Sequence, residues 1–129
     1  MGALATRHIP PALRAQLQRS LVRSHAASSG DEVESEVVRG LMLLRLQTMA
    51  TGRTGVRPAT AAAYAALLNA GITPVVREYG SLGCSGDPAP LAHAALAVMG
   101  EGDVRLAGRL MPAAAALAAA GLQPVRLAE

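Results

Sequence analysis

Alanine and leucine supply most of the apolar residues of this chain, and phenylalanine and tryptophan are absent. Alanine buries little surface, so each buried alanine contributes well under the roughly 1.5–3 kcal/mol of a buried leucine. Such a sequence suits helices that pack closely together, with a thin core for 129 residues. It favours a single, mainly α-helical unit in which neighbouring chain or subunits supply part of the core.

Proline and glycine divide the chain into segments of helical periodicity. The pattern predicts Ala-rich helices over residues 12–27, 31–50, 59–70, 89–99 and 112–121. Residues 72–78 are the only strand-like stretch, and residues 122–127 are expected to form a short extended tail. The predicted fold class is therefore mainly α with at most a small two-stranded element.

Two local expectations concern the ends and faces of these helices. Asp31 is expected to cap the second helix, and Gly71 is expected to end the third. The predicted apolar stripe of the second helix consists of Val33, Val37, Leu41 and Leu44.

Charge and cysteine content narrow the class of function. The net charge is +3 and all twelve basic residues are arginine, scattered among acids. Nucleic-acid binding needs a basic stripe with stacking aromatics, and neither is present, so no nucleic-acid partner is expected. One cysteine excludes an internal disulfide and a cysteine-based metal site. No apolar run is long enough for a transmembrane helix, so no membrane partner is expected. The first residues have no signal-peptide layout, and a cytoplasmic location is therefore expected.

The segment from Gly80 to Asp87, Gly-Ser-Leu-Gly-Cys-Ser-Gly-Asp, concentrates glycine around the only cysteine. A phosphate-binding P-loop is excluded because the chain has no lysine. A nucleophile elbow is excluded because Asp87 stands where its last glycine belongs. A thiol nucleophile built from Cys84 with His25 or His93 stays open as a third alternative, although a lone cysteine is more often an inert packing residue.

With the following Ala-Pro-Leu-Ala-His of residues 89–93, this segment resembles the signature of the histidine and aromatic amino-acid ammonia-lyases. In that family a small residue, a serine and a glycine cyclise into 4-methylidene-imidazole-5-one (MIO), an electrophile that needs no external cofactor. The resemblance implies that Cys84, Ser85 and Gly86 form MIO and are catalytic. A glycine at the attacking position suits this chemistry because it lacks a side chain that would block the bend. Asp87 is expected to support the group by capping the next helix.

Residues 16–27 resemble the family helix that carries the substrate-selectivity residues. A Ser-His pair, here Ser24 and His25, is the form associated with histidine as substrate. The resemblance implies that both bind L-histidine, with His25 near the imidazole, and that the product is urocanate. His93 is expected to be a packed structural residue. Two positions differ from the usual family pattern, because Ser28 replaces a glycine and Pro88 replaces a leucine.

Family members run to roughly five hundred residues, beyond the size of one ordinary domain. The resemblance therefore implies that residues 1–129 are a partial N-terminal region that carries the MIO loop. We expect it to lack the family's upstream tyrosine loop, which neither Tyr64 nor Tyr79 matches, and the downstream helical bundle. The full-length family is expected to be homotetrameric, and the isolated piece to be inactive. The rival interpretation is a non-catalytic truncated remnant, or an association module of a full-length lyase.

Overall fold

The computed structural model describes residue 6, residues 8–83 and residues 88–127. Within these residues the helices are α1 (Pro11–His25), α2 (Ser35–Ala50), α3 (Pro58–Asn69), α4 (Pro88–Val98) and α5 (Ala113–Ala119). The strands are β1 (Ser29–Glu32), β2 (Thr73–Pro74), β3 (Arg77–Tyr79), β4 (Asp103–Leu106) and β5 (Arg109–Pro112). All five predicted helices are present, which confirms the mainly α class.

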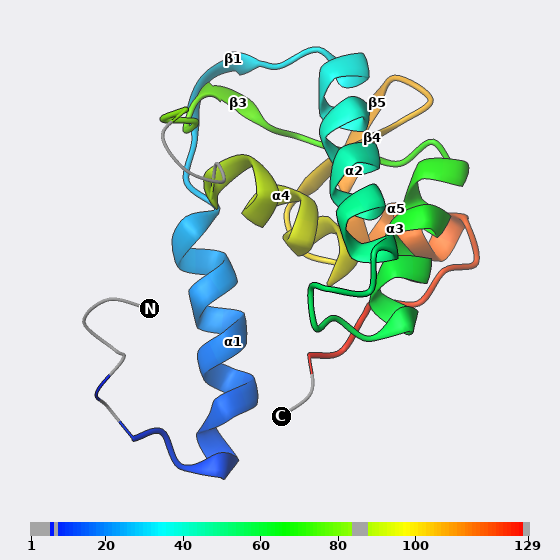
Figure 1. Cartoon of the computed structure of the whole chain (residues 1–129). Coiled ribbons are helices and arrows are strands. Elements are labelled where there is room, and N and C mark those ends of the chain that lie inside the picture. The colour runs from blue at the N-terminus through cyan, green and yellow to red at the C-terminus, as the bar shows by residue number, and fades with distance from the viewer. Residues whose placement is uncertain (1–5, 7, 84–87, 128–129) are drawn as a thin grey trace.

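Helix α4 lies at the centre of the structure. It contacts α1, α2, α3, α5 and β2. In Figure 1, α1 stands on one side of α4, and α2, α3 and α5 lie on the other side. The residues that α4 buries include Ala89, Ala92, Ala94 and Ala97. Because alanine side chains are short, the surrounding elements can approach this helix closely.

The core forms where α2 to α5 and the strands β2 and β4 meet. Its largest fully buried side chains are Met42, Leu67, Ile72, Leu117 and Val104. Helix α1 contributes no buried residue, and its Leu13 is 50% exposed. The core is therefore confined to the part of the molecule that follows α1.

The predicted start of the second helix is wrong. Asp31 lies in β1, which pairs with β3 in an antiparallel ladder, and α2 begins only at Ser35 without a side-chain cap. A short polar segment that can cap a helix can equally join a strand when a partner strand lies beside it. The partner strand β3 is 45 or more residues away, as the pairing of Glu32 with Arg77 illustrates, so no local sequence pattern predicts this pairing.

The predicted apolar stripe of this helix is wrong at Val37 and Leu44, whereas Leu41 is partly buried against the core. Val37 and Leu44 are 58% and 64% exposed, whereas α2 buries Val38, Met42 and Met49. The sequence of α2 is apolar on more than one side, so periodicity could not decide which side faces α3 and α4.

The structure contains more sheet than the sequence predicts. Besides the two-stranded pair β1–β3, the strands β2, β4 and β5 form a three-stranded antiparallel sheet. The two residues that join β4 and β5 are Ala107 and Gly108, with φ of 50° and 77°. Positive φ at both positions is typical of a type I′ hairpin turn, which favours asparagine or glycine over alanine. The turn residues therefore gave only a weak sequence signal.

The predicted end of α3 is confirmed. Gly71 has φ 70°, and its N–H donates to the Leu68 carbonyl while the Ile72 N–H donates to the Leu67 carbonyl. These two bonds form a Schellman motif, which satisfies carbonyls that the helix leaves unpaired. Helices α4 and α5 end in the same way at Gly100 and Gly121.

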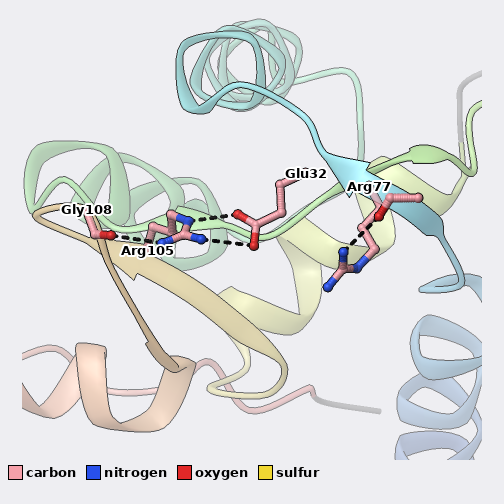
Figure 2. Close-up of polar contacts among 5 residues, drawn as sticks. Glu32, Arg77, Arg105 and Gly108 are labelled. Carbon is pink, nitrogen blue, oxygen red and sulfur yellow. Dashed lines mark hydrogen bonds and ion pairs between the residues drawn. The ribbon is translucent and has the colours of Figure 1, made fainter.

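One ion pair joins the two sheets. Arg105 on β4 donates from Nε and Nη2 to the Glu32 carboxylate on β1, at 2.7 and 3.1 Å. Its Nη1 also donates to the Gly108 carbonyl in the β4–β5 turn. One guanidinium therefore binds both the Glu32 carboxylate and the hairpin turn (Figure 2). The hydrogen bonds from Arg105 lower the pKa of Glu32 below its ordinary value, against a smaller opposing effect of burial.

This ion pair should make stability depend on pH. Because the folded-state pKa of Glu32 is lowered, its contribution is complete above the ordinary carboxyl pKa of 4.5 and is lost as pH falls through the folded pKa. Glu32→Gln should therefore lower the urea midpoint more at pH 7 than at pH 3. Glu78→Gln, at an exposed glutamate on β3, is the control. An equal effect of Glu32→Gln at both pH values would contradict the assignment.

Truncating the core should be costly despite its alanine content. Leu117 is 1% exposed, so Leu117→Ala is expected to lower the free energy of unfolding by about 2–5 kcal/mol. Leu44 is 64% exposed, and Leu44→Ala should change the free energy of unfolding by no more than about 0.5 kcal/mol. Urea unfolding followed by circular dichroism measures both, and similar losses in the two variants would show that the core is misassigned.

Candidate functional site

The predicted catalytic segment lies between β3 and α4. Its first residues, Gly80 to Gly83, are described, and the chain is described again from Pro88. The predicted residues Cys84, Ser85, Gly86 and Asp87 lie outside the described residues. The geometry of the site is therefore built from its two flanks and from the elements that contact them.

The two flanks meet at Gly80. A Cβ placed on Gly80 would lie 2.8 Å from the Ser28 Cβ, 3.2 Å from the Ala27 carbonyl oxygen and 3.3 Å from the Ala89 Cβ. Only glycine fits such a close approach without displacing a neighbour. The end of β3, the link between α1 and β1, and the first turn of α4 thus converge on one point.

The Ser28 hydroxyl makes two hydrogen bonds at this point. The Arg77 backbone N–H of β3 donates to Ser28 Oγ at 3.3 Å, and Oγ lies 2.8 Å from Nε2 of His93 on α4. The Arg77 guanidinium donates separately to the Gly30 carbonyl at 2.8 Å (Figure 2). The Ser28 side chain therefore connects the link after α1 with β3 and α4, around the start of the glycine-rich stretch.

His93 is half-buried and hydrogen-bonded, in keeping with the structural role expected for it. Burial, and secondly the positive charge of Arg77, lower the pKa of His93. The ring is therefore neutral at pH 7, and one of its two nitrogens is an acceptor. With the Arg77 amide donating to Ser28, the serine hydroxyl has its own proton to give to Nε2.

The predicted substrate-binding pair ends α1. The Leu21 carbonyl accepts hydrogen bonds from Ser24 Oγ and His25 Nδ1, both at 2.8 Å. A carbonyl can only accept, so Nδ1 carries a hydrogen, and Nε2 is the acceptor in whichever molecules carry the neutral ring. The His25 side chain is exposed, and only Ala26 and Ala27 separate it from Ser28. The pair therefore lies three to four residues before Ser28, which is at the point where the flanks meet.

A second contact fixes α1 against α4. Arg23 donates from Nε and Nη2 to the Glu101 carboxylate, at 2.7 and 3.0 Å. The hydrogen bonds from Arg23 lower the pKa of Glu101, which keeps it ionised. Because Glu101 follows the turn that ends α4, this bidentate pair orients the last turn of α1, which carries Ser24 and His25.

The buried Tyr64 is a poor candidate for a general base. Tyr64 is 4% exposed in the core, and burial raises its pKa to about 12. It therefore stays protonated at neutral pH. The ring of Tyr79 covers Gly30, where an added Cβ would lie 2.6 Å from the ring. Tyr79 therefore contacts β1 through one edge of its ring and is otherwise 66% exposed.

Sequence reasoning missed the hydrogen bond between Ser28 and His93 and the ion pair between Arg23 and Glu101. The partners are 65 and 78 residues apart. Neither pair has a local spacing that would have identified it, because the fold alone brings the partners together.

Within the described residues, no group of three or more histidine, cysteine, aspartate or glutamate side chains is placed to hold a metal ion. In the same part of the chain, no helix has the length and apolar character needed to span a membrane.

A profile of the family described as "Aromatic amino acid lyase" matches residues 1–129. The chain belongs to this family. It is 64% identical over 99% of its length to a histidine ammonia-lyase of Streptomyces coelicolor, and 50% identical over 98% to one of Gloeobacter violaceus. The chain spans about a quarter of the length of these relatives, 25% and 24%. The family resemblance inferred from the glycine-rich segment is confirmed.

Solved structures of the family share this fold. A histidine ammonia-lyase from Trypanosoma cruzi superposes with a TM-score of 0.89 at 33% identity, covering 97% of this chain and 24% of that one. The Pantoea agglomerans phenylalanine aminomutase gives a TM-score of 0.92 at 32% identity, covering 99% of this chain and 24% of that one. The chain is thus a helical piece of the ammonia-lyase fold.

The close approach at Gly80 should make this position intolerant of a side chain. Gly80→Ala is expected to cost about 1–3 kcal/mol of unfolding free energy, because the methyl group meets a backbone oxygen and two other carbons. Gly40 in α2 has no atom within 4 Å of its Cβ position. The matched Gly40→Ala should therefore stabilise the protein by about 0.5–1 kcal/mol. Chemical denaturation measures both, and equal effects would contradict the packing described at Gly80.

Proposed function

We propose that this chain is the N-terminal, MIO-bearing region of a histidine ammonia-lyase. The proposed reaction is the non-oxidative elimination of ammonia from L-histidine to give urocanate. The observation that carries the proposal is the match to the family over residues 1–129, with relatives 64% identical that are named histidine ammonia-lyases. The Ser24–His25 pair, which the resemblance associates with histidine, supports this substrate.

The residue types between the flanks suit the proposed electrophile. Cys84 would supply the carbonyl carbon that is attacked, Gly86 the amide nitrogen, and Ser85 the methylene formed by loss of water. When formed, the group supplies an electrophile for the substrate amine. The close contact among Gly80, Ser28 and Ala89 supports the proposal, because it brings together the two ends of the segment that must bend.

His25 is proposed to orient the substrate. The Leu21 carbonyl holds its Nδ1–H, so Nε2 can accept the N–H of a substrate imidazole. The Ser24 hydroxyl donates to the same carbonyl, and its oxygen lies 3.2 Å from His25 Nδ1, which supports the ring position. The ion pair between Arg23 and Glu101 fixes the helix end on which both residues lie.

The rest of the active site is proposed to come from other parts of the family protein. The general base and the remaining pocket would lie outside residues 1–129, some of them on neighbouring subunits of a homotetramer. This division accords with a chain that spans about a quarter of its relatives and with the high pKa of the buried Tyr64. The cytoplasmic location stays a prediction.

A second candidate function is a non-catalytic association module for a full-length lyase. The exposed apolar residues Val37, Leu43 and Leu44 on α2 favour it, because several large apolar side chains exposed on one helix are typical of an interface. The same surface would also be covered in a complete lyase. Chemistry at Ser85 therefore distinguishes the two functions.

Intact-mass spectrometry tests the proposed electrophile. Cyclisation releases two water molecules, so the protein at its natural length should be lighter than its sequence mass by roughly 36 Da. Ser85→Ala should abolish this loss and the formation of urocanate from histidine, whereas Ser20→Ala, at an exposed serine on α1, should preserve both.

An unshifted mass in folded protein would rule out cyclisation and favour the association module. Turnover that survives Ser85→Ala and is abolished by thiol alkylation would instead support a nucleophilic Cys84.

A further inference from the structure

The side chain of Ser28 joins the link after α1, strand β3 and helix α4. Its hydroxyl accepts from the Arg77 amide at 3.3 Å and lies 2.8 Å from His93 Nε2. Its Cβ lies against Gly80, which in turn faces Ala89. Gly80 and Ala89 are the residues that bound the eight-residue stretch 81–88.

Bringing two chain ends together has an entropic cost that local contacts must offset. Three contacts act at this closure: the bond from Arg77 holds the end of β3, the bond to His93 holds α4, and the packing at Gly80 brings the two flanks into contact. Two of the three depend on the Ser28 hydroxyl. A serine hydroxyl can accept and donate at the same time, so it can bond to the Arg77 amide and to the His93 ring together.

We infer that Ser28 is a positioning residue, whose hydroxyl holds together the two flanks of the glycine-rich segment by linking β3 to His93. It acts through the backbone and through His93, and it has no direct contact with substrate in this assignment. Its chemical consequence rests on the proposed function: with the flanks held, cyclisation of Cys84, Ser85 and Gly86 starts from fewer conformations and proceeds to a higher fraction.

Hydrogen–deuterium exchange tests the positioning role without reference to activity. In Ser28→Ala, amides of residues 80–83, 89 and 91–93 should exchange about two- to tenfold faster, which is the effect of removing one or two neutral hydrogen bonds. Residues 103–112 of β4 and β5 should be unchanged. Ser20→Ala is the control, since it removes an exposed hydroxyl from α1. Exchange in Ser28→Ala equal to that in Ser20→Ala would overturn the inference.

A double-mutant cycle separates this role from a general loss of stability. His93→Leu should accelerate the same amides, and adding Ser28→Ala to it should have a smaller effect than in the wild-type background. His93→Gln keeps an acceptor and should restore part of the protection. Fully additive effects, or identical behaviour of the leucine and glutamine variants, would show that the hydroxyl does not act through His93.

Intact mass then measures the chemical consequence. The fraction of protein lighter by roughly 36 Da should fall in Ser28→Ala, while the KM of the cyclised fraction for histidine stays unchanged. A normal cyclised fraction together with faster exchange would overturn the catalytic consequence and leave the link itself intact. Absence of the mass loss in the wild-type protein would reject the proposed function, and the exchange measurements would still decide the role of Ser28.

Discussion

The short side chains of α4 are the constraint on which the rest of the structure depends. Ala89, Ala92, Ala94 and Ala97 are buried on this helix, and four other helices contact it. A larger side chain at these positions would push a neighbour outward, because protein interiors are close-packed. Gly80 likewise has no side chain, which allows β3 and the link after α1 to contact the first turn of α4. Close approach thus links the core to the flanks of the candidate site.

Polar contacts then orient what the alanines bring together. Ser28 connects β3 and α4, Arg23 connects α1 to the turn after α4, and Arg105 connects the two sheets. Each contact joins segments distant in sequence, and each is partly exposed, so its individual contribution to stability is modest. They matter for function because they orient the last turn of α1, which carries Ser24 and His25, and the two flanks of the glycine-rich segment.

Much of the fold could be predicted because helix boundaries are local. Proline begins α1 and α3, and glycine with positive φ ends α3, α4 and α5. The sheets could not be predicted to the same degree. The β4–β5 hairpin turns at Ala107, a residue that rarely adopts positive φ, and β1 consists of Ser-Gly-Asp-Glu, which has little intrinsic strand preference. The buried face of α2 was likewise undecided until α3 and α4 were in place.

The sequence by itself determined the family and the residue types of the candidate site, because the chemistry of Cys84, Ser85 and Gly86 depends on contiguous residues whose order is read directly. It also placed His25 near the end of a helix predicted over residues 12–27, and the structure ends α1 at His25 itself. Tertiary structure alone decided that Ser28 contacts His93, that Gly80 faces Ala89, and that Tyr64 is too deeply buried to act as a base. These facts arise from contacts between distant segments. They depend on how the helices pack, and no local spacing in the sequence encodes them.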